Sequence, residues 1–340
     1  AGFGKAWWVP DDYWAHNTVL YAKDFKGNDP AFVYYLLDFI DFSKYNSGGA
    51  QPSLNRTFIN PIPVEIPPLP EQCRIAEILR TWDGAIEKLE ALRAAKERRR
   101  DALTYLLVFG ARQLNDFDDQ GQPRKLRWFD LPASWDCRPV DAIASEVSER
   151  NGDGKHEVLS CSKYDGFVRS LEYFKKQVFS SDLSGYKVIR RGEFGFPSNH
   201  VEEGSIGLQN LVDTGLVSPI YTVFRFDPAI IDNDYAFAVL KTSLYRHIFE
   251  VSTSASVDRR GSLRWSEFSN IPFPLPPLEE QRAIMAVIQA ARSDVEATAR
   301  EITALKRQKR GLMQKLLTGE WRVSVDPYRS PTDKKEAAHG

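Results

Sequence analysis

The chain carries one apolar, proline-rich phrase twice, as INPIPVEIPPLPEQ at residues 59–72 and SNIPFPLPPLEEQ at residues 269–281. The two copies share one ungapped register, in which matching residues are 209 positions apart: Pro67 and Pro276, Gln72 and Gln281, Gly110 and Gly319. A repeat this long indicates a duplicated module rather than a solenoid, whose units are much shorter. At 340 residues the chain is also long enough for two or more domains.

Each copy continues into a stretch with the signals of a long helix. The proline pair ends an extended segment, because proline fixes φ and disfavours helical geometry in the residue before it. Glu71 and Glu280 then fall in the first helical turn, where a carboxylate favours the positive end of the helix dipole. Gly110 and Gly319 are typical helix stops. Apolar residues recur between these points at heptad spacing, which predicts a helix of about ten turns with a narrow apolar seam.

The seam residues are Ile75, Leu79, Trp82, Ile86, Leu89, Leu103 and Leu107 in the first copy, and Ile284, Ile288, Val295, Ile302, Leu305, Leu312 and Leu316 in the second. Basic residues interrupt the first copy at Arg93, Lys96 and Arg100, so its seam should loosen midway. Because such a seam needs a partner, we predict that the two helices pack antiparallel as an intramolecular coiled coil. The alternative is that each helix docks on its own globular domain.

The sequence between the copies is rich in aromatic residues, β-branched residues and turn signals. GYKVIRRGEFGF and SPIYTVFRFD predict strands, and DNDYAFAVLKTSLYRHIFEV predicts one amphipathic helix. The segment before the first copy matches only the closing part of this domain: NDPAFVYYLL corresponds to DNDYAFAVLK, and NTVLYAKDF to IYTVFRFDP. The expected order is therefore domain, helix, domain, helix.

The predicted fold class is α+β, with β-rich globular domains joined by two long helices packed as an antiparallel intramolecular coiled coil. The predicted boundaries are residues 1–61 for the last part of a first globular domain, 62–126 for the first repeat helix, 127–275 for a second globular domain, 276–323 for the second repeat helix, and 324–340 for a disordered tail.

Signals of catalysis and metal binding are missing from the sequence. Cys73, Cys137 and Cys161 are too few and too scattered for a disulfide framework or a zinc cluster, so we expect ordinary thiols in a reducing cytoplasm. The five histidines lack metal-binding spacing, and no nucleophile elbow, phosphate-binding loop or dinucleotide fingerprint occurs. No run of about 18 apolar residues predicts a membrane span. We expect no catalytic residue, metal or cofactor in this chain.

Candidates for DNA contact come from local groups of residues, because the formal net charge is only −1. Residues 127–275 hold 17 lysines and arginines against 20 aspartates and glutamates, so binding would need a segregated face. Arginine suits guanine, asparagine suits adenine, and lysine or serine suits phosphate. The candidates are Lys163, Tyr164, Lys175, Lys176, Lys187, Arg190, Arg191, Ser198, Asn199, His200, Arg259, Arg260 and Arg264.

Arg259 and Arg260 are the strongest of these candidates. They are adjacent, they lie in a loop that contains glycine and serine, and an aromatic residue, Trp265, follows closely. That combination suits insertion into a groove of DNA. For each of the other candidates a solvated surface position is the simpler interpretation.

The repeated phrase, followed by a heptad helix that closes on LMQKLLTGEWRV at residues 312–323, resembles the specificity subunit of type I restriction–modification systems. HNTVLYAKDFKGNDPAFVYYLL at residues 16–37 and GLVSPIYTVFRFD at residues 215–227 resemble target-recognition domains of that family. The resemblance implies that two such domains each read one half of a bipartite double-stranded DNA target. It also implies that the paired helices fix their separation and dock two methyltransferase subunits.

The same resemblance implies that restriction subunits join the assembly later, and that S-adenosylmethionine, ATP and magnesium belong to the partner subunits. The short first domain departs from the family pattern. An incomplete sequence, a trimmed expression product and a natural partial subunit that works with a second copy would each explain it.

Two other functions stay open at this stage. A coiled-coil interaction scaffold without DNA specificity would use the β-rich domain for a protein ligand. A nuclease hidden in the central domain would require metal-dependent cleavage by the purified chain. The bases that are read and the gap between half-sites depend on loop geometry, which residue spacing does not reveal.

Overall fold

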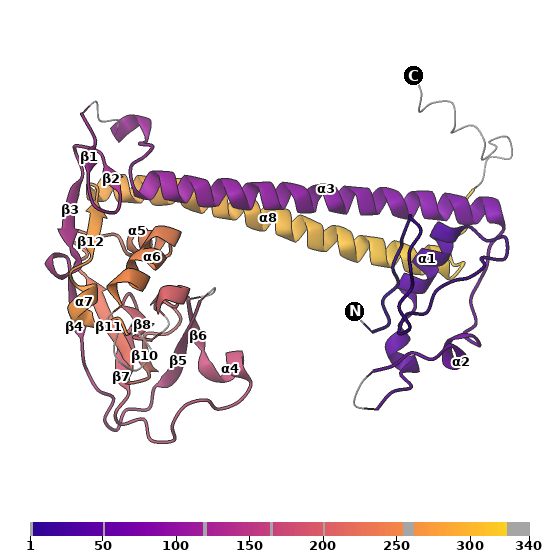
Figure 1. Cartoon of the computed structure of the whole chain (residues 1–340), viewed down its shortest axis with the longest axis horizontal. Coiled ribbons are helices and arrows are strands. Elements are labelled where there is room, and N and C mark those ends of the chain that lie inside the picture. Colours follow the sequence, from indigo (N-terminus) through magenta and orange to yellow (C-terminus); the bar gives the residue numbers. More distant parts are fainter. Residues whose placement is uncertain are drawn as a thin grey trace. The chain divides into compact units, whose positions relative to one another are not determined.

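The computed structural model describes residues 3–49, 52–117, 121–163, 166–199, 201–253 and 262–324. The chain divides into two compact units, which we call the first unit (Ala1–Ala95 with Val295–Gly340) and the second unit (Lys96–Asp294). Two helices of 40 residues each, α3 (Leu69–Val108) and α8 (Leu278–Leu317), contribute a part to both units (Figure 1). Both helices begin directly after a proline pair, as the duplication predicts.

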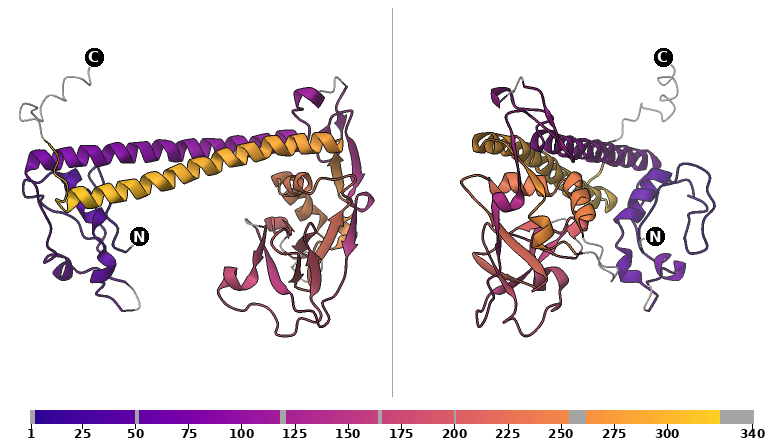
Figure 2. Two further views of the ribbon diagram at one scale, coloured as in Figure 1. Left: turned by 180° about the vertical axis from the view of Figure 1, so that it is seen from behind. Right: turned by 60° about the vertical axis from the view of Figure 1, so that its left-hand side comes forward.

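The first unit is mainly helical in its described part. Besides its parts of α3 and α8 it contains α1 (Pro30–Phe39), a 3-10 turn (Phe42–Tyr45) and the short α2 (Arg56–Ile59). Helix α1 lies beside these parts of α3 and α8 (Figure 2). Together they form one core from Ala31, Phe32, Tyr35 and Leu36 of α1, Ile75, Ala76 and Leu79 of α3, and Met313, Leu316 and Leu317 of α8.

The second unit holds the β-rich domain. Among its described residues the strands form two four-stranded sheets, ordered β6-β5-β10-β7 and β4-β11-β8-β9, and two ribbons, β1-β2 and β12-β3. The strands are β1 (Arg124–Lys125), β2 (Asp130–Leu131), β3 (Asp136–Pro139), β4 (Ala144–Val147), β5 (Glu157–Ser162), β6 (Gly166–Arg169), β7 (Lys187–Arg190), β8 (Phe194–Pro197), β9 (Gly207–Leu208), β10 (Thr214–Val217), β11 (Tyr221–Phe226) and β12 (Pro272–Leu275). Its shorter helices are α4 (Ser170–Phe174), α5 (Asn233–Leu240), α6 (Ser243–Ser252) and α7 (Trp265–Phe268), and 3-10 turns span Asn115–Phe117, Val140–Ala142 and Val201–Glu203.

An aromatic core holds the second unit together. Phe194 of β8 and Phe224 of β11 stack with ring centroids 5.4 Å apart, and Phe224 also lies 4.9 Å from Phe268 of α7. All three side chains are fully buried. Because aromatic pairs add contact energy to their large buried area, this core fixes the strand ends from which the loops of the domain extend.

The predicted single helix over DNDYAFAVLKTSLYRHIFEV is wrong, because the structure has two helices there, α5 and α6. Thr242 breaks the helix. Its extended backbone ends α5, and its hydroxyl accepts the Tyr245 N–H at 3.2 Å, which caps α6. The bend turns both Tyr235 of α5 and Tyr245 of α6 into the core, where both are fully buried.

Within each unit α3 and α8 lie antiparallel. In the first unit Lys306 pairs with Glu90 and Lys309 with Asp83, so residue numbers fall along α3 as they rise along α8. In the second unit Lys96 of α3 pairs with Asp294 of α8 at 2.7 Å. The antiparallel pairing predicted from the heptads is therefore present in both units.

Most predicted seam residues lose much of their solvent exposure. The buried ones are Ile75, Leu79, Ile86, Leu107, Ile284, Ile288, Val295, Ile302 and Leu316, and the half-buried ones are Trp82, Leu89, Leu103, Leu305 and Leu312. No α3 residue between Ile86 and Leu107 is buried, and this stretch holds Arg93, Lys96 and Arg100. At their ends the seams also contact globular parts of the same unit. The structure therefore combines the predicted coiled coil with the alternative, in which each helix docks on a globular domain.

The glutamine of each repeated phrase anchors a helix in the same way. Gln72 accepts the Asp29 N–H at 2.9 Å and donates to the Pro67 carbonyl at 2.9 Å. In the second copy Gln281 accepts the Asp232 N–H at 2.8 Å and donates to the Pro276 carbonyl at 2.9 Å. Asp29 and Asp232 are the N-caps of α1 and α5. Each glutamine therefore ties a long helix to the start of a short one.

The two long helices also end alike. Gly110 and Gly319 have φ of +65° and +72°, a left-handed conformation that glycine adopts without strain. The Arg112 N–H donates to the Leu106 carbonyl at 3.0 Å in the first copy, and Trp321 to Lys315 at 2.9 Å in the second. In each copy the hydrogen bond joins residues six positions apart, on either side of the glycine. It satisfies a carbonyl that the helix end would otherwise leave free.

No helix among the described residues combines the length and the apolar character needed to cross a lipid bilayer. The predicted tail at 324–340 lies outside the described residues, except for Ser324.

Candidate nucleic-acid interface

Three of the predicted polar segments meet at one end of the strands of the second unit. The Leu263 N–H donates to the Ser198 carbonyl at 2.8 Å, which joins the segment before α7 to the end of β8. Ser198 donates its N–H and its hydroxyl to the Ile220 carbonyl, at 3.2 and 2.6 Å, and so reaches the turn between β10 and β11. The third segment, the turn between β5 and β6, is held by a lysine.

Lys241, at the end of α5, is that lysine. Its ammonium donates to the Lys163 carbonyl at 2.9 Å and to the Gly204 carbonyl at 2.8 Å. Gly204 closes the segment that begins at Ser198, so the β5–β6 turn is held beside it. We call Lys163, Ser198, Asn199, Ile220 and Arg264 the loop face.

The loop face presents several kinds of group that suit the edges of bases. Arg264 is exposed, and its backbone N–H donates to Glu267 at 3.1 Å, which starts α7 without engaging the guanidinium in an ion pair with a described residue. The Asn199 side chain is half-buried and has no hydrogen bond to a described residue. Ile220 is 53% exposed. These segments therefore carry a guanidinium, an amide and an apolar side chain, which are the kinds of group that match guanine, adenine and the thymine methyl group.

Three other predicted cations already have partners within the domain. The Lys187 ammonium donates to the Tyr221 carbonyl at 2.6 Å, and burial lowers the pKa of this half-buried amine. Arg190 pairs with Glu149 at 2.8 Å, and Arg191 pairs with Asp213 at 3.1 Å. Because these charges already have partners, they are weaker candidates for DNA contact than Arg264.

Lys175 and Lys176 are not brought to the loop face. They follow α4, which continues β6 at the end away from the Lys163 turn, and Lys175 adopts a left-handed conformation with φ of +53°. Both lysines are exposed, as are the neighbouring Tyr173 and Phe174. They form a second, separate polar and aromatic surface on this domain.

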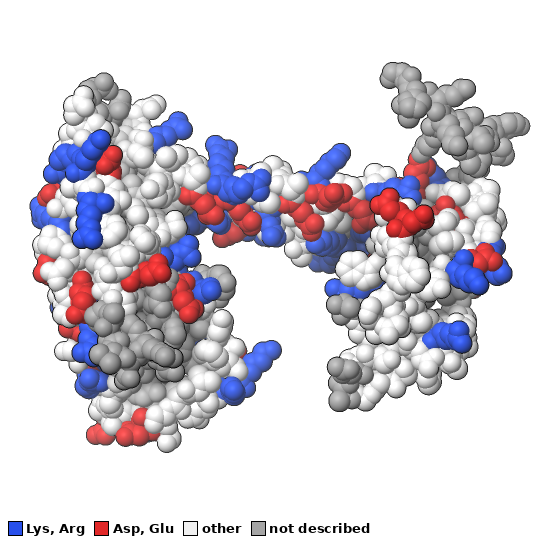
Figure 3. All heavy atoms as spheres, in the orientation of Figure 1, with Lys and Arg blue, Asp and Glu red and all other residues white. Residues whose placement is uncertain are grey.

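Four predicted residues, Tyr164, His200, Arg259 and Arg260, lie outside the described residues, so their contribution stays a prediction. Their described chain neighbours include Lys163 and Asn199 of the loop face. On the view in Figure 3, blue and red atoms interleave over the described part of the second unit. Residues that contact DNA must therefore be identified from their exposure and neighbours, because this face shows no single large basic patch.

Sequence reasoning missed three residues of this region. Ile220 sits at the tip of a tight turn, where the Ser-Pro before it was a usable turn signal. Lys241 acts through backbone carbonyls far along the chain, for which the sequence holds no signal. Arg225 is exposed on β11 and lines an open groove of about 760 Å³ together with Arg190 and Arg191.

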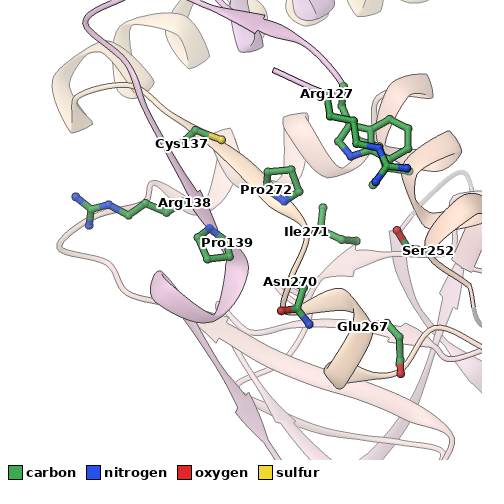
Figure 4. Close-up of a pocket in the computed structure, with 11 residues that line it drawn as sticks. Arg127, Cys137, Arg138, Pro139, Ser252, Glu267, Asn270, Ile271 and Pro272 are labelled. Atoms are coloured by element: carbon green, nitrogen blue, oxygen red, sulfur yellow. The ribbon is translucent and has the colours of Figure 1, made fainter. Parts of the chain in front are cut away.

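A cleft of about 460 Å³ opens between the β3–β12 ribbon and the helices α6 and α7 (Figure 4). The Arg127 guanidinium lies 4.6 Å from the centre of the Trp128 ring on one wall. In Figure 4 Cys137 and Arg138 lie on the opposite side of Ile271 from Arg127 and Glu267. Burial raises the pKa of the Cys137 thiol, which therefore stays protonated and is a poor nucleophile at neutral pH.

The described residues contain no group of three or more histidine, cysteine, aspartate or glutamate side chains arranged to hold a metal ion. The loop face itself offers hydrogen-bond donors, an amide and apolar surface. Such a set binds and discriminates ligands, and it has no nucleophile and base in contact with each other.

A family model described as type I restriction modification DNA specificity domain matches residues 1–96 of this chain. The type I restriction enzyme MjaVIII specificity subunit of Methanocaldococcus jannaschii is 23% identical over 312 residues, which cover 87% of this chain and 71% of that protein. The putative type I restriction enzyme MjaX specificity subunit of the same organism is 22% identical over 330 residues, covering 91% and 72%.

The HsdS subunit from Thermoanaerobacter tengcongensis is among the solved structures that match this chain, with 19% identity and a TM-score of 0.46 over 86% of this chain and 71% of that one. A structure described as the structural basis underlying complex assembly and conformational transition of the type I R-M system matches with 19% identity and a TM-score of 0.49, over 86% and 72%.

Proposed function

We propose that this chain, which belongs to the family of type I restriction–modification specificity subunits, recognises DNA sequence through the loop face of its second unit. The observation that carries this proposal is the convergence of three loop segments, fixed by the Leu263–Ser198 and Lys241–Lys163 hydrogen bonds, around an exposed Arg264 and an amide at Asn199. Base edges are read by side chains of these types.

The second part of the proposal concerns assembly. The chain carries the same helix anchor twice, at Gln72 and Gln281, and the same helix stop twice, at Gly110 and Gly319. Duplicated anchors give one polypeptide two equivalent surfaces, which suits the docking of two methyltransferase subunits. The bipartite target, with one half read by each recognition domain, and the later binding of restriction subunits belong to the same proposal.

Catalysis in this proposal belongs to the methyltransferase and restriction subunits. We propose that this chain is non-catalytic, in keeping with the family of specificity subunits. S-adenosylmethionine, ATP and magnesium would then be bound by the methyltransferase and restriction subunits.

The experiment is a selection from random double-stranded DNA with the chain bound to its methyltransferase subunit. The expected result is one enriched sequence motif, retained between low and moderate salt, because base contacts survive screening better than phosphate contacts do. The variant that combines Asn199→Ala with Arg264→Ala should lose or relax part of that motif, at about 1–3 kcal/mol for each lost base contact.

The matched control is the variant Arg190→Ala with Arg191→Ala. It removes the same number of side chains from the same domain, but from residues already paired with Glu149 and Asp213. The enriched motif should stay unchanged. Enrichment of no motif at either salt concentration would contradict the proposal, and so would a motif insensitive to Asn199 and Arg264.

A protein-interaction scaffold without DNA specificity is the second candidate. It is favoured by the cleft of Figure 4, whose lining includes the apolar Ile248 and Ile271 and the cation–aromatic pair of Arg127 and Trp128. This function predicts no enriched DNA motif in the same selection, and partner capture that is weakened by Trp128→Ala.

A further inference from the structure

The segment that follows β6 in the second unit carries large apolar side chains on its surface. Each of the eight residues from 171 to 178 is exposed. Four of them are apolar, since Leu171, Tyr173, Phe174 and Val178 are 56%, 49%, 41% and 48% exposed. Exposed apolar side chains that are grouped in this way mark a binding surface, whereas single ones are ordinary. We call residues 171–178 the α4 surface.

The α4 surface is held by the domain at both of its ends. Before it, Ser170 is buried, and its hydroxyl lies 2.7 Å from the Ser160 hydroxyl of β5. After it, Phe179 packs against a small core that contains Tyr186, and the Ser180 N–H donates to the Tyr186 hydroxyl at 3.2 Å. The exposed side chains therefore project from a backbone that is anchored on either side.

Two lysines lie within the α4 surface. Lys175 and Lys176 are exposed, and neither forms an ion pair with a described residue. Two lysines against one carboxylate, Glu172, give the segment a formal net charge of +1. Figure 3 shows basic atoms protruding at the position that α4 has in Figure 1, with uncharged atoms around them on this face. Lysines beside apolar groups suit a ligand that alternates anionic and less polar parts, as the phosphates and sugars of DNA do.

The position of α4 relative to the loop face fits such a ligand. Strand β6 begins at Gly166, shortly after Lys163 of the loop face, and α4 follows the other end of this strand. The four residues of β6 span about 13 Å in extended conformation. The major groove of B-DNA is about 12 Å wide between the strands that border it. When the loop face lies in the groove, the α4 surface therefore lies near a bordering strand.

We propose that the α4 surface holds the DNA backbone next to the half-site that the loop face reads. The ammonium groups of Lys175 and Lys176 contact phosphates, and the exposed rings of Tyr173 and Phe174 pack against the adjoining sugars. Contacts of this kind position a protein on the duplex and carry no sequence information. The inference rests on the proposed DNA recognition, but it predicts a different quantity, the dependence of affinity on salt.

The backbone of Lys175 allows a variant that tests the charge alone. Its φ of +53° lies in the left-handed region, which glycine adopts without strain. Lys175→Gly should leave the melting temperature nearly unchanged, because relief of this strain offsets the greater flexibility of glycine in the unfolded chain. A loss of DNA affinity in this variant then reports the missing ammonium group.

The experiment measures the affinity of the chain, bound to its methyltransferase subunit, for a labelled duplex with the selected motif and for a shuffled duplex, between about 50 and 200 mM salt. Lys175→Gly combined with Lys176→Ala should weaken binding to both duplexes by about tenfold or more. The slope of log affinity against log salt should become shallower by about 1.8, at about 0.9 for each lost phosphate contact. Phe174→Ala should weaken binding without changing that slope, because a sugar contact releases no counterion.

The matched control is Arg190→Ala with Arg191→Ala, which removes two charges from the same domain at residues that are already paired. It should leave the salt slope nearly unchanged. If the lysine variant also leaves the slope unchanged while the motif is still enriched, this inference is wrong and the proposed function stands. A shallower slope without any enriched motif would support the phosphate contacts and contradict only the reading of sequence.

Two further outcomes would overturn the inference. Absence of DNA binding by the complex at any salt concentration would contradict both the inference and the proposed function. Capture of the methyltransferase subunit in the absence of DNA gives the other test. If the lysine variant or Phe174→Ala weakens that capture while the salt slope stays unchanged, the α4 surface docks a protein, and its assignment to the DNA backbone is wrong.

Discussion

In the second unit the proline phrase is a buried strand that ends at a glutamine anchor, whereas in the first unit the same phrase ends at the same anchor but stays exposed. The difference lies in one neighbour, the segment that leads into β3. Residues 17–25, which match part of β11, likewise form no strand, since no described residue pairs with them. The repeated sequence is therefore enough to form the glutamine anchor in both units, whereas the buried strand forms only where a neighbouring strand pairs with it.

The largest expected difference between the two units concerns the glycines that end the long helices, Gly110 and Gly319. Alanine at either glycine meets the left-handed backbone penalty of about 1–2 kcal/mol. Gly110→Ala also forces a Cβ atom against Pro132, and such overpacking costs about 1–3 kcal/mol more. Chemical unfolding should show a larger loss for Gly110→Ala than for Gly319→Ala. Equal losses would mean that the packing around the two glycines does not differ.

The anchors give the next largest effect. Gln281→Leu removes the partner of the Asp232 N–H, of the buried Pro276 carbonyl and of the part-buried Ile230 carbonyl, which should destabilise the second unit by about 2–4 kcal/mol. Gln72→Leu should cost less, about 1–2 kcal/mol, because one of its three partners is the side chain of Asn28, which can turn to water. Hydrogen exchange at the first turns of α5 and α1 measures each loss separately. A greater loss at α1 would contradict the expected order.

Ion pairs between the helices give a smaller effect. Lys309 is only 12% exposed, pairs with Asp83 and lies 5.0 Å from the Tyr35 ring, so Lys309→Met should cost about 1 kcal/mol. Lys96→Met, at the pair with Asp294, should cost about 0.5 kcal/mol or less, since that aspartate is 55% exposed. Thermal unfolding in low and high salt distinguishes them. If salt reduces the Lys309 effect more than the Lys96 effect, the assigned burial is wrong.

The smallest effect concerns pH. The Arg322 guanidinium lowers the pKa of the Glu71 carboxyl, with a further contribution from the Val323 N–H. Because the pKa is lower in the folded state, this stabilisation is present above the ordinary carboxyl pKa near 4.5 and is lost as the pH falls further. Arg322→Met should therefore reduce stability slightly at pH 7 and by less at pH 3. The difference in melting temperature between the two pH values tests the sign.

Most of the fold that could be predicted came from the register of the repeat, which located the two long helices. Prolines, first-turn carboxylates and terminal glycines are local signals, so both long helices lie between the proline pairs and the glycines. Both are shorter than the predicted segments 62–126 and 276–323, and α3 already ends at Val108. The break at Thr242 was missed because apolar periodicity continues across it, while the capping hydroxyl that stops α5 is a weaker signal. Strand pairing of the residues before each long helix, 63–66 and 272–275, depends on residues far away in the chain, and composition alone does not reveal it.

The candidate site was predicted in part for a similar reason. Turn residues such as Ser198 and Arg264 were found because turns carry a recognisable composition. The pairing of Arg190 with Glu149, 41 residues earlier, depends on strand order, and a basic residue looks the same in the sequence whether it is paired or exposed. Lys241 was missed because it positions the loop face through backbone carbonyls.

Sequence recognition by the second unit is tested most directly by mapping methylated bases in the genome of a host that produces this chain with its methyltransferase subunit. The account predicts methylation at one bipartite motif, and it predicts that replacing Asn199 and Arg264 by alanine changes one half of that motif while leaving the other half intact. Methylation that is unaltered by those replacements, or that is the same without this chain, would contradict it.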